Sequence, residues 1–246
     1  MQPPFEVLYE DNHLLVVNKP AGWVSQGALP DAKSLLDEAA QYIRTKYQKP
    51  GNVFLGVVSR LDKSVSGVTV IARTSKAAAR LSEQFRDRDV GKTYWAVVSH
   101  DHSTPLPHHT TVTLNHWLLQ NEQDAIVRIV RPQSRGAKEA ILKYTPLAEL
   151  APQTGLLQIE LLTGRKHQIR AQLAHTGLSI VGDRKYGSQI PFHAGIMLHA
   201  VSLQLQHPTQ KEPDTQKPLQ LSFTAPLPKS WLQKFPKVAT VDGVCE

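Results

Sequence analysis

The sequence is poor in cysteine and in long apolar runs. Its single cysteine, Cys245, is the next-to-last of 246 residues, so no internal disulfide and no cluster of thiolate metal ligands can form, and a reducing, cytoplasmic location is expected. The longest apolar runs, such as residues 14–17, fall far short of the roughly 18 residues that a membrane helix requires. No basic region leading into an apolar stretch opens the chain. We therefore predict neither a membrane span nor a secretory signal.

Positive charge is in excess, and it is unevenly distributed. The chain has 28 Lys and Arg against 21 Asp and Glu. Residues 1–123 carry 13 basic and 12 acidic side chains, whereas residues 124–246 carry 15 and 9. The second half is therefore where a polyanion such as RNA or DNA would bind. No linker divides the chain, so we expect one domain spanning residues 1–246, with a core from about residue 5 to 227 and a peripheral tail.

The pattern of apolar residues predicts more strands than helices. Three helices are expected: one capped by Ser34 and ending near Tyr47, one capped by Thr74 and ending near Arg88, and one from Arg165 to His175. Short β-rich runs predict strands at 5–10, 13–18, 54–58, 67–72, 93–98, 125–130, 140–144, 156–162, 196–205 and 219–223. Residues 100–122 are weakly patterned. These spacings favour an α+β fold with a mixed, mostly antiparallel central sheet flanked by helices and loops.

Asp62 is the first candidate for chemistry. It lies between Arg60 and Lys63 in a polar loop that predicted strands bound on both sides. A carboxylate beside cations stays ionised, which suits a nucleophile or a base. The competing interpretation is a turn aspartate that caps the loop, and spacing alone favours it.

Residues 163–170 form a second candidate site, at a predicted junction from strand to helix. They include the cations Arg165, Lys166 and Arg170. The amide groups at a helix N-terminus add donors for a phosphate. A solvated helix face is the alternative.

Histidine is concentrated between residues 100 and 116, where five of the eleven histidines lie. Metal sites with such spacing normally need a carboxylate or a fixed helical register as well, and Asp101 is the acidic residue nearby. We expect a variable loop and no metal site. A zinc hydrolase that uses this stretch is the rival hypothesis.

Several blocks, taken in order, resemble the RluA-type family of RNA pseudouridine synthases. The blocks are Leu14-Leu15-Val16-Val17-Asn18-Lys19-Pro20-Ala21-Gly22, Ser59-Arg60-Leu61-Asp62 with Ser66-Gly67, Gln84-Phe85-Arg86, Lys92-Thr93-Tyr94, Thr163-Gly164-Arg165-Lys166-His167-Gln168-Ile169-Arg170, Ile180-Val181-Gly182-Asp183 with Tyr186-Gly187, and Leu198-His199-Ala200 with His207-Pro208. Ser59 stands where the family usually has His. Many relatives carry a small RNA-binding domain before the catalytic one; only four residues precede Phe5 here, so we expect the catalytic domain alone.

The resemblance implies a pseudouridine synthase fold and the isomerisation of specific uridines in ribosomal or transfer RNA. The base is flipped out of its stack into a cleft; the reaction involves no redox change, so no cofactor is implied. By similarity, Asp62 attacks the ribose or removes a proton from it, Tyr94 stacks on the base and Arg170 pairs with Asp62. The residues expected to contact RNA are Lys19, Arg60, Arg165, Lys166 and His167.

Two further expectations complete the prediction. The protein is expected to be a monomer with no obligate protein partner. The competing function is a catalytically silent module of the same fold that binds RNA without turnover, and intact residues at positions 62, 94 and 170 argue against it.

Overall fold

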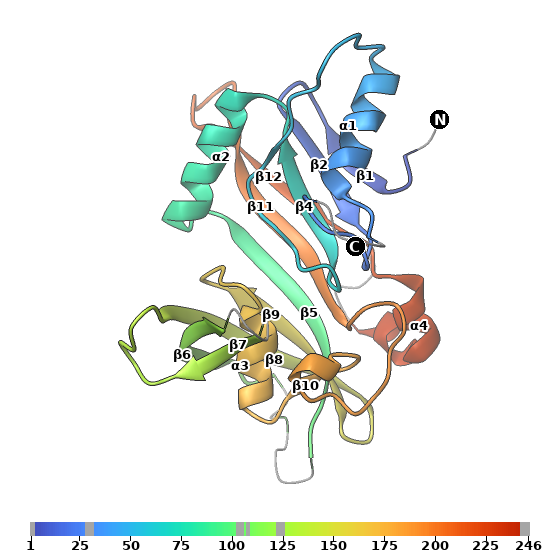
Figure 1. Cartoon of the computed structure of the whole chain (residues 1–246), viewed down its shortest axis with the longest axis vertical. Helices are drawn as coiled ribbons and strands as arrows, with labels where there is room; N and C mark the ends of the chain where they lie inside the picture. The colour runs from blue at the N-terminus through green and yellow to red at the C-terminus, as the bar shows by residue number, and fades with distance from the viewer. Residues whose placement is uncertain (1–2, 28–31, 102–105, 107–108, 122–125, 242–246) are drawn as a thin grey trace. The chain divides into compact units, whose positions relative to one another are not determined.

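The computed structural model describes residues 3–27, 32–101, 106, 109–121 and 126–241. The chain forms two compact units (Figure 1). The first unit contains residues 1–91 and 200–226, and the second contains residues 92–199 and 227–246. Within the described ranges, no helix is long and apolar enough to cross a membrane.

The first unit is built on a sheet in which β1 (Glu6–Glu10), β2 (Leu14–Lys19), β4 (Ser66–Ala72) and β11 (Leu198–Lys211) follow one another. The short β3 (Gly56–Val57) pairs with β4, and β12 (Pro218–Thr224) pairs with β11. All seven residues of β4 are buried. This strand therefore lies at the centre of the unit, and the loop that carries Asp62 leads directly into it.

Two helices of the first unit begin at the predicted caps. In α1 (Leu35–Lys46) the Ser34 side chain accepts a hydrogen bond from the backbone of Asp37, and in α2 (Ser75–Asp87) Thr74 plays the same role. The buried residues of α1 recur every four positions and pack on the sheet, as the predicted amphipathic pattern requires. The core cluster beneath α1 consists of Phe5, Leu15, Val17, Leu35, Ala39, Ile43 and Ile71.

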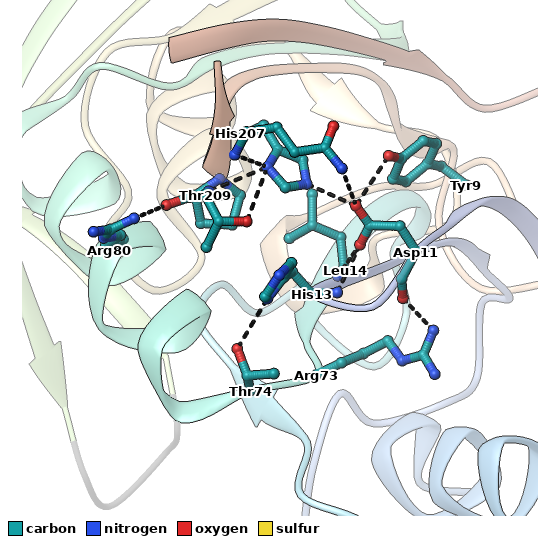
Figure 2. Close-up of polar contacts among 11 residues, drawn as sticks. Tyr9, Asp11, His13, Leu14, Arg73, Thr74, Arg80, His207 and Thr209 are labelled. Carbon is teal, nitrogen blue, oxygen red and sulfur yellow. Dashed lines mark hydrogen bonds and ion pairs between the residues drawn. The ribbon is translucent and has the colours of Figure 1, made fainter.

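A polar network stabilises the turn between β1 and β2 (Figure 2). Asp11 Oδ1 accepts hydrogen bonds from the backbone N–H groups of His13 and Leu14, both at 2.7 Å. Its Oδ2 accepts from the Tyr9 hydroxyl at 3.1 Å and lies 2.7 Å from His207 Nε2. The carboxylate therefore ties this turn to β11.

His207 completes the network as a neutral ring. Its Nδ1 accepts hydrogen bonds from the backbone N–H groups of Thr209 at 3.1 Å and Gln210 at 2.7 Å. Because Nδ1 acts as an acceptor, the ring proton resides on Nε2 and is donated to Asp11. The block that contains His207-Pro208 thus has a structural role in the first unit.

The strands of the second unit pair with one another in antiparallel fashion. Its strand order is β5 (Gly91–Ser99), β9 (Thr154–Leu161), β8 (Lys138–Ala151), β6 (Val112–Asn121) and β7 (Ile126–Val130), and β10 (Ser179–Ile180) pairs with β5. The helical elements are α3 (Gln168–His175), η1 (Arg184–Tyr186), α4 (Lys229–Lys234) and η2 (Pro236–Thr240). Two side chains of the C-terminal tail, Trp231 and Val238, are fully buried. The fold is α+β with mostly antiparallel strands, which confirms the predicted class.

Candidate active site

Asp62 lies in the loop between β3 and β4, where hydrogen bonds fix the backbone on both sides of it. Ser25 Oγ lies 3.0 Å from the carbonyl oxygen of Leu61, to which it donates, and accepts from the Leu61 N–H at 3.1 Å. The Gly22 N–H donates to the carbonyl of Lys63 at 2.7 Å. The side chain of Asp62 is half-buried. The segment after β2 therefore holds the Asp62 loop in place.

Lys19 stabilises the same segment through hydrogen bonds to its backbone. Its side chain is fully buried, and its Nζ donates to the carbonyls of Pro20 and Trp23, both at 2.9 Å. Burial lowers the pKa of the Lys19 ammonium from 10.5 to about 7, although the negative charge of Asp62 acts in the opposite direction. The RNA contact expected of Lys19 stays a prediction, for a side chain that is fully buried in this structure.

Gly67, at the start of β4, allows two strands to approach closely. Its φ is +121°, and a Cβ at this position would lie 2.3 Å from the carbonyl oxygen and 2.4 Å from the nitrogen of Ala200. A side chain there would collide with backbone that cannot move aside. The glycine of the Ser66-Gly67 block thus fixes how β4 lies against β11.

Arg170 occupies the first turn of α3 in the second unit and is held by Asp183. Its Nε lies 2.7 Å from Asp183 Oδ2 and its Nη2 lies 2.9 Å from Oδ1. Both side chains are buried, with 7% and 2% of their surface exposed. The guanidinium carbon lies 4.9 Å from the centroid of the Tyr186 ring. Two parallel hydrogen bonds and a ring face therefore define the plane of this guanidinium.

The loop before α3 folds around the side chain of Gln168. Gln168 Oε1 accepts from Thr163 Oγ1 at 2.8 Å and from the Arg165 N–H at 3.0 Å, and its Nε2 donates to the Ile141 carbonyl at 3.1 Å. The helix consequently begins at Gln168. The sequence predicted a start at Arg165, which is wrong by three residues. The Arg165 amide, expected to help bind a phosphate, is bonded to the protein itself.

The three RNA-binding candidates of this loop differ in exposure. Lys166 is exposed, whereas Arg165 is half-buried and its Nε donates to the Glu139 carbonyl at 3.0 Å. His167 is half-buried in a left-handed backbone conformation (φ 51°), and its Nδ1 lies 3.0 Å from the Tyr186 hydroxyl oxygen. In the first unit, the candidate Arg60 is exposed.

Tyr94 and Trp95 are neighbours in β5 and point to opposite faces of the strand. Trp95 is buried, with 3% of its surface exposed, and Tyr94 is half-buried. Trp95 therefore packs in the core of the second unit. Asp62 belongs to the first unit, whereas Tyr94 and Arg170 belong to the second, and the pairing of Asp62 with Arg170 stays a prediction.

Two residues of the site received no role from sequence. In the sequence, Asp183 and Tyr186 belong to a matching block without a predicted role, yet they contact Arg170 and His167. Their signal was the block itself, because a Gly-Asp pair followed by Tyr-Gly is typical of a tight, fixed loop.

The histidine-rich stretch forms no metal site within the described residues, where no group of three or more potential ligands occurs. His116 lies beside His175, with ring centroids 5.2 Å apart, and burial together with His175 lowers its pKa. His102, His108 and Cys245 lie outside the described residues.

Comparison with known proteins adds the following similarities. The model of the family described as RNA pseudouridylate synthase matches residues 13–175. The ribosomal large subunit pseudouridine synthase D of Zymomonas mobilis is 33% identical over 237 residues, covering 92% of this chain and 70% of that protein. The tRNA pseudouridine synthase C of Salmonella typhi is 31% identical, with 93% and 87% covered. Among solved structures, human RNA Pseudouridylate Synthase Domain Containing 4 is 25% identical, with a TM-score of 0.71, and 94% of this chain and 93% of that chain are covered.

Proposed function

Because the chain belongs to the RluA-type RNA pseudouridine synthase family, we propose that it acts on ribosomal or transfer RNA with Asp62 as its catalytic carboxylate. Members of this family are isomerases that convert uridine to pseudouridine in RNA. The observation that carries the proposal is the anchored loop: hydrogen bonds from Ser25 and Gly22 fix the backbone on either side of Asp62. A nucleophile needs such a fixed position.

The proposed reaction breaks the bond between the ribose carbon and a ring nitrogen of uracil and forms a bond from the same ribose carbon to a ring carbon. The proton on that ring carbon is lost, and the freed nitrogen gains one, so atoms and electrons balance without a redox partner. Asp62 either attacks the ribose or removes a proton from it. The target uridine is flipped out of its stack to reach the carboxylate.

Tyr94 and Arg170 are proposed to assist Asp62. Tyr94 would stack on the detached base and help to transfer the proton at the ring carbon. Arg170 would balance the negative charge of Asp62, which a water-excluding site would otherwise disfavour. What supports the role of Arg170 is its rigid setting against Asp183.

RNA contacts are proposed for four residues: Arg60, Arg165, Lys166 and His167. Arg60 and Lys166 are exposed and suit backbone phosphates, whereas half-buried His167 suits a shorter-range contact near the site. We further propose that the protein acts as a monomer without an obligate protein partner.

The test of the function is Asp62→Asn with ribosomal and transfer RNA as substrates. The change removes the nucleophile but little binding surface, so turnover should fall by at least about a thousandfold while RNA affinity stays within a few fold. Pseudouridine would be mapped in RNA incubated with the wild type and with the variant, and affinity would be measured by filter binding.

The control is Asp37→Asn, which removes an exposed carboxylate from α1 and should leave turnover unchanged. Product formed by Asp62→Asn at the wild-type rate would refute the role of Asp62. Absence of product with the wild type on both RNA classes would favour the silent RNA-binding module.

A further inference from the structure

The segment around Asp183 and Tyr186 belongs to a matching block, and the function proposed above gives neither residue a task of its own. In the second unit it lies directly against two residues that do. Asp183 bonds to Arg170 through both carboxylate oxygens, and Tyr186 contacts Arg170 through its ring and His167 through its hydroxyl. One short segment thus contacts one proposed catalytic residue and one proposed RNA-binding residue.

We propose that Asp183 and Tyr186 are positioning residues with separate tasks: Asp183 aims Arg170 for catalysis, and Tyr186 aims His167 for RNA binding. The proposal rests on the proposed function, because it assigns the two tasks through the roles of Arg170 and His167 given there.

The geometry of Arg170 carries the first task. A guanidinium has five N–H donors in one plane. Asp183 takes the edge formed by Nε and Nη2, at 2.7 and 2.9 Å. The donors on Nη1 therefore point away from Asp183, and the Tyr186 ring at 4.9 Å limits rotation of the plane. Arg170 is already oriented before a substrate arrives, which is what a group that stabilises a charged intermediate requires.

The loop that carries Asp183 is closed by its own backbone. The Asp183 N–H donates to the Ile180 carbonyl at 2.9 Å, and the Asp183 carbonyl accepts from the N–H groups of Tyr186 at 3.0 Å and Ser188 at 3.1 Å. Gly182 has a φ of +87°, and a Cβ there would lie 2.9 Å from the Gly195 carbonyl oxygen. The carboxylate therefore projects from a fixed backbone. Its two hydrogen bonds hold the Arg170 guanidinium in a fixed orientation.

The hydroxyl of Tyr186 carries the second task. Its oxygen accepts a hydrogen bond from the Val127 N–H at 2.9 Å and lies 3.0 Å from His167 Nδ1. The Val127 N–H fixes the position of the hydroxyl oxygen, and the hydrogen bond between this oxygen and Nδ1 fixes the position of the His167 ring. Tyr186 thus sets the orientation of this ring.

The two tasks can be separated by substitution. Asp183→Asn keeps the size of the side chain but loses the charge and one acceptor, so it disturbs Arg170 and leaves the hydroxyl of Tyr186 in place. Tyr186→Phe keeps the ring face beside Arg170 but loses the hydroxyl, so it disturbs His167. Matched controls come from the network in Figure 2, where Asp11→Asn and Tyr9→Phe make the same chemical changes in the first unit.

The experiment measures kcat and KM for an RNA transcript that the wild type modifies. Asp183→Asn should lower kcat about 10- to 100-fold with KM within twofold, because it acts only through Arg170. Tyr186→Phe should raise KM about three- to tenfold with kcat within twofold. Asp11→Asn and Tyr9→Phe should lower the melting temperature and leave kcat and KM unchanged.

The outcomes distinguish this proposal from the proposed function. Unchanged kcat in Asp183→Asn, together with a large loss in Arg170→Gln, would overturn the positioning role but keep Arg170 in the mechanism. Unchanged kcat in Arg170→Gln would instead overturn the role of Arg170 in the proposed function. Equal effects of Tyr186→Phe on kcat and KM would overturn the separation of tasks.

Asp183→Asn leaves the buried Arg170 without its counter-charge, and the variant could fail to fold. Asp183→Glu then decides, because it keeps the charge but displaces the carboxylate by one methylene. A folded Asp183→Glu protein should show reduced kcat with unchanged KM, and wild-type kcat in this variant would overturn the proposal.

Discussion

Lys19 is a fully buried amine whose pKa has fallen from 10.5 to about 7, mainly because burial penalises the charged form. The neutral amine keeps two N–H groups, enough for the carbonyls of Pro20 and Trp23. Near neutral pH, the positive charge of Lys19 that interacts with Asp62 therefore depends on pH. A lysine that loses its proton so close to pH 7 makes both stability and the electrostatics of the Asp62 loop sensitive to small changes in acidity.

This shift predicts how stability depends on pH. Between pH 7 and 10.5 the unfolded chain holds a proton on Lys19 that the folded chain has released. The free energy of unfolding should therefore rise with pH in this window, by up to about 1.4 kcal/mol per pH unit from this group. Lys19→Met has no such proton, so the difference between wild type and variant should grow in favour of the wild type from pH 7 to 9.5.

Urea unfolding of both proteins at several pH values measures this difference, because most other titrating groups cancel. A difference that stays constant across the window would show that Lys19 keeps its proton in the folded protein.

Gly67 and Gly22 provide a second test of single positions. Both have positive φ, but a Cβ on Gly67 would collide with the Ala200 backbone, whereas nothing lies within 4 Å of a Cβ on Gly22. Gly67→Ala should therefore lower the free energy of unfolding by about 3 kcal/mol or more. Gly22→Ala should lower the free energy of unfolding by only about 1–2 kcal/mol, the cost of a positive φ for a residue with a Cβ. Equal losses in denaturant unfolding would mean that the close approach of β4 and β11 relaxes.

Among the elements, those set by local signals were predicted well. The helices α1 and α2 begin directly after Ser34 and Thr74, because the side-chain oxygen of each of these residues accepts a hydrogen bond from the backbone N–H three residues further on. The strand β6 was missed, because half-buried His116 and Trp117 interrupt the alternation around Leu114 and Leu118. Its register is decided by pairing with β7 and β8, which no local pattern contains.

The start of α3 was predicted three residues too early for a related reason. Gln168 draws residues 163–165 into a loop by hydrogen bonds to Thr163, Arg165 and Ile141. The last of these is a partner from β8, so the helix boundary depends on tertiary structure. The same reason explains why Asp183 received no role: its partner Arg170 is a contact between elements.

Gln168→Ala should therefore loosen this loop without unfolding the second unit. Loss of three hydrogen bonds should cost about 2–4 kcal/mol, and hydrogen exchange at the Arg165 amide should accelerate. Gln84→Ala is the matched control, because Gln84 makes two hydrogen bonds to the Gln206 backbone in the first unit and should accelerate exchange there instead. Faster exchange at Arg165 in the control would contradict a local role for Gln168.

Across the whole molecule, charge follows the two units. The first unit carries 14 basic and 12 acidic side chains and the second carries 14 and 9, so most of the net charge belongs to the second. The sequence predicted an excess in the second half, which is close to this result. It did not predict the division itself, because residues 200–226 return to the first unit and no linker marks that return. The single domain expected from sequence stays a prediction.

The charge of the second unit predicts the salt dependence of RNA binding. If exposed Lys166 contacts a phosphate, Lys166→Gln should lower the slope of log affinity against log salt by roughly 0.7 to 0.9, equally for all RNA sequences. Lys76→Gln is the control, since Lys76 is an exposed lysine of α2 in the first unit. Equal slopes for wild type and Lys166→Gln would place the phosphate contact elsewhere.

The discontinuous first unit has a consequence for synthesis on the ribosome. Its central strand, β4, is buried along its whole length and needs β11, which emerges only after residues 92–199 have been translated. Until then, the nascent chain carries an apolar strand edge that could pair with other chains. The strands of the second unit, which follow one another along the chain, can assemble during this interval. The first unit is therefore completed only when β11 has been translated, and chaperone binding to the unpaired edge of β4 should matter most before that point.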